Sequence, residues 1–263
     1  MSQRFSIESV LILGAGNVGS HLAKALFHSG VRITGVVSRT RSKADEIVGI
    51  TGGIAAEDPE DIREISDLAL ICVSDPAISE VALQLGGKAT MLAHTSGSTA
   101  MDVLGPSGLP SGVIYPLQTF SRARELDYSQ IPFLIEASDA RVAEALTTLA
   151  GQISHNVMQA DSIIRRKVHI AAVYACNFSN HLASIAFKML EKEGVDPSVL
   201  LPLMRETLDK LTYLSPDKAQ TGPAVREDHA TMESHLRELE GLTIEEEIYR
   251  LLSANIIRYK KQQ

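Results

Sequence analysis

Six residues near the start of the chain, Gly14-Ala15-Gly16-Asn17-Val18-Gly19, lie between an apolar run typical of a buried parallel strand (10–13) and a segment with apolar residues at helical spacing. In such a strand–turn–helix, the first glycine permits the tight turn and the second lets the backbone approach a pyrophosphate. The third lets the helix pack closely on the strand, and the helix N-terminus offers N–H groups to phosphate. A glycine-rich turn without a ligand is the alternative. The residues predicted to bind a dinucleotide are Gly14, Gly16, Asn17, Val18 and Gly19.

The end of the second predicted strand, 31–37, indicates which dinucleotide is bound. Enzymes that use NAD usually carry Asp or Glu about 20 residues beyond the glycines, where the carboxylate binds the ribose 2′-OH. No carboxylate occurs between Gly30 and Asp45, and Ser38-Arg39-Thr40-Arg41 follows the strand instead. Hydroxyl and guanidinium groups can donate to a 2′-phosphate. The alternative is that these residues form a solvated basic loop. We therefore expect NADP(H), bound through Ser38, Arg39 and Thr40.

Length and composition limit the classes of function that this chain can have. Its 263 residues suffice for one α/β domain and a smaller second domain. The formal net charge of −7 argues against non-specific nucleic-acid binding, and no apolar stretch approaches the ~20 residues of a membrane span. Cys72 and Cys176 are too few for a disulfide framework or a zinc site, and both are expected to be buried, inert thiols. We expect a cytoplasmic protein with a small-molecule substrate, no metal, and no nucleic-acid or membrane partner.

Two further predicted strands end in polar loops. The run at 68–73 leads into Ser74-Asp75-Pro76, and the run at 89–93 leads into His94-Thr95-Ser96-Gly97-Ser98. Loops at the carboxyl ends of strands line the ligand crevice of a doubly wound sheet, so we expect the first loop beside the nicotinamide half of the cofactor. The residues predicted to make that contact are Val73, Ser74 and Asp75.

The second of these loops combines one imidazole with several hydroxyl groups. His94 and Ser96 could bind a carboxylate or donate a proton to a substrate. Either Ser96 or Ser98 could instead cap a helix that begins near Thr99, and we favour this structural role for Ser98.

The order of the remaining elements predicts the fold class. Further strands are expected at 112–115, where Pro116 ends the ladder, and at 131–136, followed by a helix at 140–150 and a short segment at 154–157. This order predicts a doubly wound, mostly parallel Rossmann sheet in residues 1–157, followed by an all-helical domain in residues 158–263. Helices of that second domain are expected from Asp161 or Ser162 to Glu193, after Pro197, and at 244–257.

The first helix of the helical half carries an unusual polar face. At α-helical spacing this face holds His169, Cys176 and Asn180, with Arg166 and Asn177 at its edges and Lys167 on the opposite side. We interpret His169 as a proton donor and Asn177 as a substrate anchor. A helix–helix or dimer seam with satisfied amides is the alternative, because buried polar groups need partners.

The segment 220–229 of the helical half gathers several hydrogen-bonding side chains. They could close over an anionic substrate, although Gly-Pro before a helical pattern also favours a plain helix start. The side chains concerned are Thr221, Arg226, Asp228 and His229.

Four stretches of the chain carry a family resemblance: HTSGS (94–98), YPLQTF (115–120), HIAAVYACNF (169–178) and QTGPAVRED (220–228). Together they resemble the DUF2520 family of NADP-dependent oxidoreductases over nearly the whole chain. The architecture is more distantly similar to β-hydroxyacid dehydrogenases and pyrroline-5-carboxylate reductases. The resemblance implies an N-terminal NADP-binding domain, a C-terminal helical domain that forms a homodimer, and a substrate site between the domains.

One departure from the relatives limits what can be inferred about the reaction. β-Hydroxyacid dehydrogenases use a Lys followed four residues later by Asn, whereas here Lys167 is followed at that offset by Ala171. We therefore expect an NADPH-dependent reductase of a small polar carbonyl or imine that bears a carboxylate, with His169 or His94 as proton donor. The alternatives are an NADP-binding regulatory or sensor protein without turnover, and a dehydrogenase that works in the oxidative direction.

Overall fold

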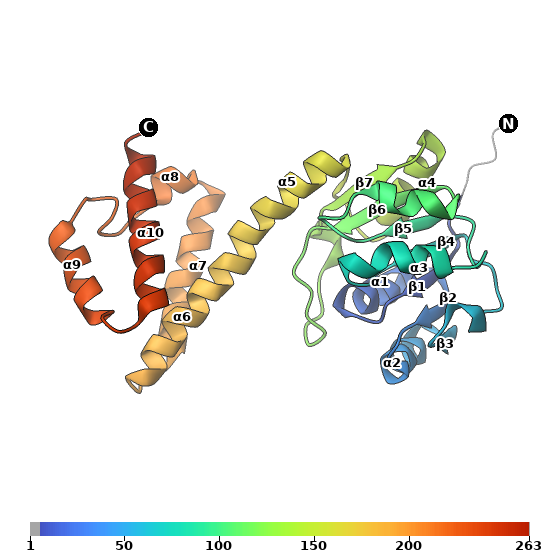
Figure 1. Cartoon of the computed structure of the whole chain (residues 1–263), viewed down its shortest axis with the longest axis horizontal. Helices are drawn as coiled ribbons and strands as arrows, with labels where there is room; N and C mark the ends of the chain where they lie inside the picture. The colour runs from blue at the N-terminus through green and yellow to red at the C-terminus, as the bar shows by residue number, and fades with distance from the viewer. Residues whose placement is uncertain (1–5, 263) are drawn as a thin grey trace. The chain divides into compact units, whose positions relative to one another are not determined.

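The computed structural model describes residues 6–262, and the chain divides into two compact units, Met1–Asn177 and Phe178–Gln263 (Figure 1). The first unit holds the sheet and the second is helical. The sequence places the domain boundary at 157/158. The first compact unit extends farther because helix α5 (Ser162–Ala172) is tied to the sheet through a buried ion pair between Arg165 and Glu136.

The first unit is built on an eight-stranded sheet with the order β3-β2-β1-β4-β5-β6-β7-β8. All neighbouring strands are parallel except β6 and β7, which pair antiparallel. The strand order reverses between β1 and β4, which is the switch point where doubly wound sheets bind their ligands. The prediction of a doubly wound, mostly parallel sheet is confirmed. The strands are β1 Ser9–Leu13, β2 Arg32–Val37, β3 Ile54–Ala56, β4 Leu68–Ile71, β5 Leu92–His94, β6 Ser111–Pro116, β7 Phe133–Ala137 and β8 Val157–Gln159.

Helices cover both faces of the sheet because its central strands are apolar on both sides. In β1, Val10 and Ile12 belong to the core on one face, and Leu11 and Leu13 to the core on the other. The helices α1 Asn17–His28, α2 Arg41–Thr51 and α4 Ala140–Gly151 cover the first face. The helix α3 Ile78–Gln84 and the 3₁₀ segment η3 Met101–Ser107 cover the second.

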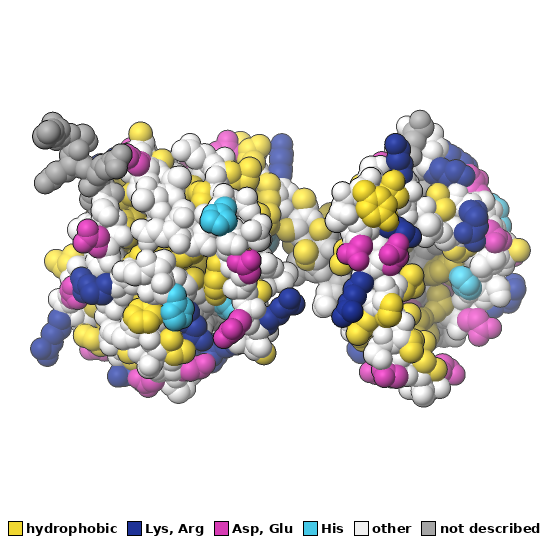
Figure 2. Space-filling model, turned by 180° about the vertical axis from the view of Figure 1, so that it is seen from behind, with side chains coloured by type: hydrophobic (Ala, Val, Ile, Leu, Met, Phe, Trp, Pro, Cys, Tyr) yellow, Lys and Arg dark blue, Asp and Glu magenta, His cyan; other side chains and the backbone are white. Residues whose placement is uncertain are grey.

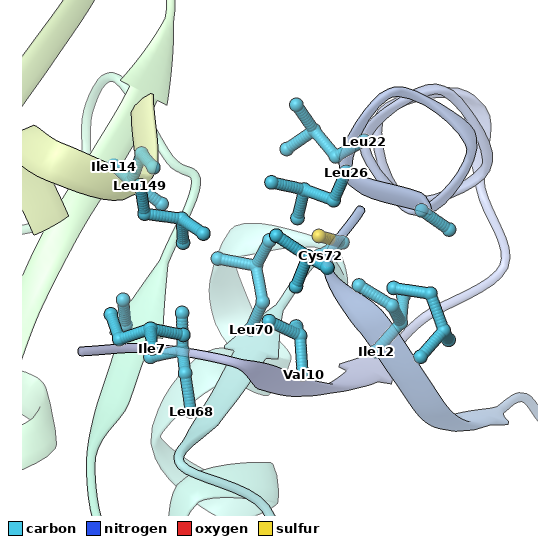
Figure 3. Packing of buried hydrophobic residues seen from close by; sticks show 14 of the residues in the cluster. Ile7, Val10, Ile12, Leu22, Leu26, Leu68, Leu70, Cys72, Ile114 and Leu149 are labelled. Atoms are coloured by element: carbon cyan, nitrogen blue, oxygen red, sulfur yellow. The ribbon is translucent and has the colours of Figure 1, made fainter. Parts of the chain in front are cut away.

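The packing of α1 fixes the place of the glycine turn that precedes it. Figure 3 shows Leu22 and Leu26 of α1 directed toward Val10, Leu70 and Cys72 of the sheet. Leu22 and Leu26 are each 1% exposed, so burying either side chain contributes about 1.5–3 kcal/mol. The turn is therefore held between a rigid strand and a rigid helix.

The long helix predicted from residue 161 or 162 to 193 is interrupted in the middle. Asp161 caps its start by accepting from the N–H of Ile164 at 2.8 Å, and Gly194 follows its end with φ 72°, as expected. Between α5 and α6 (Ser179–Lys192), however, residues Val173–Phe178 form a π-helical segment. A π turn changes the angle between successive residues, so the prediction that His169, Cys176 and Asn180 share one face is wrong.

The helical unit has a small apolar core of its own. Among its described residues, the only side chains that are less than one-tenth exposed are Ala224, Met232 and Leu239. The predicted helices after Pro197 and near the C-terminus are present. The elements are α6, the 3₁₀ segments η6 Pro197–Leu200 and η7 Lys210–Thr212, and the helices α7 Leu201–Asp209, α8 Pro216–Ala219, α9 His229–Glu238 and α10 Thr243–Lys260. None of the helices in the described part of the chain is long and apolar enough to cross a membrane.

Candidate functional site

A cavity of about 440 Å³ opens at the carboxyl ends of β1, β2 and β4. This is the switch point of the sheet, where a dinucleotide is expected. The cavity brings together the glycine turn, the end of β2 and the end of β4. Of the residues predicted to bind the cofactor, it is lined by Gly14, Gly16, Ser38, Arg39, Thr40, Val73 and Ser74.

The three glycines of the turn are required for different reasons. Gly14 has φ 112°, and a Cβ there would lie 2.5 Å from the carbonyl oxygen of Cys72. A Cβ on Gly19 would lie 1.9 Å from the carbonyl oxygen of Gly14. A Cβ on Gly16 would meet nothing within 4 Å, and Gly16 is the N-cap of α1 without a side-chain cap. The protein itself needs the first and third glycines, while the open space at the second fits a pyrophosphate.

Two cations flank the end of β2. Arg39 and Lys43 both line the cavity, together with the hydroxyl-bearing Ser38 and Thr40. Arg41 does not, and instead pairs with Asp45 of its own helix at 3.1 Å. The donor set suits a ribose 2′-phosphate. Lys43 was missed by the sequence analysis, although its place in the first turn of α2 follows from a helix that begins at Arg41.

Three of the predicted cofactor residues do not present their side chains to this cavity. The Asn17 Nδ2 donates to the carbonyl oxygen of Phe120 at 3.0 Å, and Val18 packs against the apolar core. Asp75 accepts a hydrogen bond from the hydroxyl of Ser98. Asn17 and Val18 retain only their backbone groups for a phosphate contact.

Ser96, rather than Ser98, organises the turn that follows β5. The Ser96 hydroxyl accepts from the N–H groups of Ser98 at 3.2 Å and Thr99 at 2.9 Å. The helix expected near Thr99 is the 3₁₀ segment η3, whose N-cap is Ala100 with no side-chain hydrogen bond. The expectation that Ser98 caps a helix is therefore wrong, because its hydroxyl is bonded to Asp75.

His94 is a buried, neutral part of the same turn. Its side chain is 0% exposed, and its Nδ1 accepts from the N–H of Ser96 at 3.1 Å. Burial, together with the positive charge of Arg165, lowers the pKa of His94 to about 4. A ring with no contact to solvent and so low a pKa is neutral at pH 7 and holds the turn in shape.

A hydrogen-bonded pair joins β6 to α5. The hydroxyl of Tyr115 lies 3.0 Å from Nδ1 of His169, and the two rings meet edge to face with centroids 5.9 Å apart. Burial raises the pKa of Tyr115, so the phenol stays protonated and can donate. A Cβ on Gly97 would lie 2.7 Å from both rings, so this glycine makes the close approach possible. The structure thereby brings His169 to the His94–Ser98 turn.

A buried ion pair fixes the helix that carries His169. Arg165 is 0% exposed, pairs with the Glu136 carboxylate and donates to the carbonyl oxygen of Thr99. The Ser162 hydroxyl adds a hydrogen bond of 2.8 Å to the same carboxylate. Removing one partner of a buried pair costs about 3–5 kcal/mol, because the other charge is left uncompensated.

Sequence reasoning missed Tyr115, Gly97 and Arg165. Tyr115 gave a usable signal, because it stands at the carboxyl end of a predicted strand, where functional residues gather. Gly97 and Arg165 gave none, since their roles depend on a contact between segments far apart in the chain.

Asn177 and the cysteines complete the list of predicted residues. Asn177 lies in the π-helical segment with an exposed side chain, and within residues 6–262 no hydrogen bond links it to His169. Cys72 is buried, which raises the pKa of its thiol to about 12, as expected of an inert thiol. Cys176 is exposed, so the expectation of a buried thiol is wrong there. It lies in the π-helical segment, whose geometry the periodicity did not reveal.

The polar segment 220–229 lies in the helical unit. Asp228 caps α9 by accepting from the N–H of Thr231 at 3.1 Å. Glu227 has φ 56°, a left-handed conformation, and its carboxylate lies 3.6 Å from the ammonium of Lys261. Part of this segment therefore forms the start of a helix, which is the alternative to a role in substrate binding.

Two family models match the chain. One, described as "Domain of unknown function (DUF2520)", matches residues 131–256, and the other, described as "NADP oxidoreductase coenzyme F420-dependent", matches residues 9–93. A search of curated proteins gave no match to this sequence.

Solved structures extend the comparison. A "putative NADP oxidoreductase" of Bacteroides fragilis is 36% identical, with a TM-score of 0.91 over 97% of this chain and 100% of that one. A reductive aminase of Aspergillus terreus in complex with NADPH and ethyl-5-oxohexanoate is 18% identical, with a TM-score of 0.66 over 98% and 95%. An imine reductase of Myxococcus stipitatus in complex with NADP⁺ is 18% identical, with a TM-score of 0.61 over 97% and 93%. The three likenesses confirm the predicted fold. The match to the NADP oxidoreductase model and the likeness to the Bacteroides fragilis protein confirm the predicted cofactor, NADP(H).

Proposed function

The chain belongs to the family of the Bacteroides fragilis NADP oxidoreductase and carries a DUF2520 domain, and we propose that it reduces the C=N or C=O bond of a small polar substrate that bears a carboxylate. NADPH supplies the hydride when it is bound. The observation that carries the proposal is the Tyr115–His169 pair, an imidazole held at the carboxyl end of β6. In a doubly wound sheet, ligands bind at this edge.

In this proposal His169 donates the proton that accompanies the hydride. The Tyr115 hydroxyl holds the ring through Nδ1, which leaves Nε2 as the nitrogen available to a substrate. The ring is half-buried, so the imidazolium form can deliver its Nε2 proton to the substrate nitrogen or oxygen and become a neutral imidazole. His94 is excluded from the role because it is fully buried and its pKa is lowered to about 4.

An exposed guanidinium near His169 supports a substrate with a carboxylate. Arg166 lies three residues before His169 on α5, so the two side chains are neighbours on the helix surface. Arginine binds carboxylates through two parallel hydrogen bonds, which fixes orientation as well as charge. We assign Arg166 this anchoring role and leave Asn177, in the π-helical segment that follows α5, as a further polar contact.

Imines are favoured over simple carbonyls as the reducible group. The reductive aminase and the imine reductase of the comparison share this fold and bind NADPH or NADP⁺. The lysine–asparagine pair of β-hydroxyacid dehydrogenases is absent, since Lys167 is followed four residues later by Ala171. An imidazolium can protonate the nitrogen of a developing amine and is left as a neutral imidazole.

The experiment is a substrate screen with a matched variant. NADPH oxidation is followed with 2-oxo acids, cyclic imino acids, and 2-oxo acids mixed with amines, for the wild-type protein and for His169→Ala. We expect turnover with at least one imine, and a loss of about 10²-fold or more in His169→Ala, the range of general acid catalysis. NADPH binding is measured in parallel. Full turnover by His169→Ala would overturn the assignment of the proton donor.

We also propose that the protein is a homodimer formed through the helical unit. This unit buries few apolar side chains, while large apolar side chains of α7 and α10 are exposed. Figure 2 shows hydrophobic side chains on the surface of the helical unit. An exposed apolar surface of this kind is typical of an interface. On α7, Leu203 is 64% exposed and Leu208 is 65% exposed, and on α10 Leu251 is 70% exposed. Light scattering after gel filtration tests the proposal: we expect a dimer for the wild type and dissociation in Leu203→Asp or Leu251→Asp. A monomeric wild-type protein would contradict it.

One observation favours a second function, an NADP sensor without turnover. The site lacks the lysine–asparagine pair that dehydrogenases of similar architecture use, because the residue four positions after Lys167 is Ala171 and not an asparagine. If the protein binds NADPH tightly but oxidises it with no member of the screen, and a partner protein binds only in the presence of NADPH, the sensor replaces the reductase.

A further inference from the structure

A loop that follows β6 is fastened to the first turns of α1. This loop, residues 117–128, is called the strap below. The Asn17 Nδ2 donates to the carbonyl oxygen of Phe120 at 3.0 Å, and the His21 Nε2 donates to the carbonyl oxygen of Ser121 at 2.9 Å. The Tyr128 hydroxyl lies 2.7 Å from Nδ1 of His21. The strap is therefore held against the helix whose N-terminus faces the dinucleotide.

Arg122 of the strap reaches the glycine turn itself. Its guanidinium donates to the carbonyl oxygen of Ala15, the residue between the first two glycines, and its Nη1 lies 3.1 Å from the Glu46 carboxylate. The side chain is 29% exposed, so part of it remains open to solvent or to a ligand. Arg122 does not line the cavity, but it contacts Ala15, which does, and it belongs to a segment distant in sequence from Arg39 and Lys43.

The charge of Arg122 is unusual for this position. The N-terminus of α1 is the positive end of a helix dipole, and its first turn contains no acidic residue. A cation is disfavoured there unless an anion lies nearby. The compensating group in the structure is Glu46, which is more than half exposed and belongs to a different helix. A pyrophosphate at Gly16 would place negative charge between Arg122 and the helix N-terminus.

We propose that Arg122 is a cofactor-positioning residue that binds the pyrophosphate of NADP(H), separately from the cations that bind its 2′-phosphate. The inference rests on the cofactor and not on the proposed reduction. The strap supplies one charged wall of the pyrophosphate site, and the glycine turn supplies the backbone N–H groups of the other. Holding the strap to Asn17 and His21 keeps the guanidinium at the turn before the cofactor arrives.

The test compares ligands that do and do not carry a pyrophosphate. Isothermal titration measures the Kd of NADP⁺ and of adenosine 2′-monophosphate, which has the 2′-phosphate alone. The variants are Arg122→Ala, Arg122→Lys, Arg39→Ala, and Arg124→Ala as the matched control. Arg124 belongs to the same strap, is exposed, and its removal changes the net charge by the same amount.

A charge-assisted hydrogen bond predicts a loss of about tenfold or more. Arg122→Ala is expected to raise the Kd of NADP⁺ by this factor and to change the Kd of adenosine 2′-monophosphate by less than about twofold. Arg122→Lys is expected to recover part of the NADP⁺ affinity. Arg39→Ala is expected to weaken both ligands, and Arg124→Ala neither.

Two results would overturn the proposal. If Arg122→Ala binds NADP⁺ as well as wild type does, the guanidinium does not touch the cofactor. If it weakens both ligands equally and lowers the melting temperature of the ligand-free protein, its role is to hold the strap in place. Arg122→Gln, which can still donate to Ala15, decides the outcome if the alanine variant does not fold. Normal NADP⁺ affinity in that variant likewise contradicts the proposal.

Discussion

The Tyr115 hydroxyl of β6 and the His169 imidazole of α5 are joined by a hydrogen bond of 3.0 Å. We predict that Tyr115→Phe lowers kcat by about 10- to 100-fold, because Nδ1 of His169 loses the hydrogen-bond partner that orients the ring. The Kd of NADPH should change by less than twofold, since Tyr115 is not among the residues that line the dinucleotide cavity. A parallel loss of cofactor binding would argue against a role in proton transfer.

Gly97 is predicted to be required for this pair. In Gly97→Ala the new methyl group meets both rings at 2.7 Å, so they must move apart. Overpacking of this kind costs about 1–3 kcal/mol. Chemical denaturation measures the loss, and Gly105→Ala is the matched control, because a Cβ there meets nothing within 4 Å. Equal stabilities of the two variants would show that the pair is loosely held.

Gly16 is predicted to serve the cofactor more than the fold. Gly16→Ala should weaken NADP⁺ binding by about tenfold or more, because the methyl group occupies the space of the pyrophosphate. The ligand-free variant should lose at most about 1 kcal/mol, the difference between glycine and alanine at an N-cap. Gly14→Ala should instead destabilise the ligand-free protein, since its φ is 112°. Thermal melts with and without NADP⁺ separate the two effects.

The cofactor preference is predicted to depend on Arg39 and Lys43 and not on Arg41. Arg39→Ala or Lys43→Ala should raise the Kd of NADP⁺ by about tenfold, the value of a charge-assisted hydrogen bond, and leave NAD⁺ little changed. Arg41→Ala removes the same charge but only an exposed pair with Asp45, so both affinities should stay the same. An NADP⁺/NAD⁺ ratio unaffected by Arg39→Ala would place the 2′-phosphate elsewhere.

The buried His94 predicts that stability falls in mild acid. Its pKa is about 4 in the folded protein and 6.5 when the ring is free, so the unfolded chain binds more protons between these values. The contribution of His94 to the free energy of unfolding is fully present above pH 6.5. It decreases as the pH falls toward 4, by up to about 3 kcal/mol. His94→Gln should show a smaller decrease from pH 7 to pH 5 in denaturant titrations. An unchanged decrease would mean that other groups cause the acid sensitivity.

Local sequence patterns predicted much of the fold and the residues around the dinucleotide cavity, but they did not predict the Tyr115–His169 pair. The apolar runs and the glycine turn predicted the central strands, α1 and the NADP groove, because a strand–turn–helix is specified by neighbouring residues. The prediction that Ser98 caps a helix was wrong because a capping pattern depends only on the few residues that follow it in the chain. In the structure the Ser98 hydroxyl donates to Asp75, which lies in the loop after β4. The π-helical segment escaped notice because α-helical periodicity assumes a constant turn.

Residues adjacent in the chain were enough to predict a dinucleotide site at Gly14–Gly19 and a 2′-phosphate contact with the cations that follow β2. The structure places Gly14, Gly16 and Arg39 around one cavity, as a strand–turn–helix specified by neighbouring residues requires. Three contacts arise only when the chain is folded: Tyr115 with His169, Arg165 with Glu136, and Arg122 with Ala15. Each of these contacts joins residues 29 or more positions apart. The packing of helices and loops on the sheet creates them, and local sequence patterns contain no record of that packing.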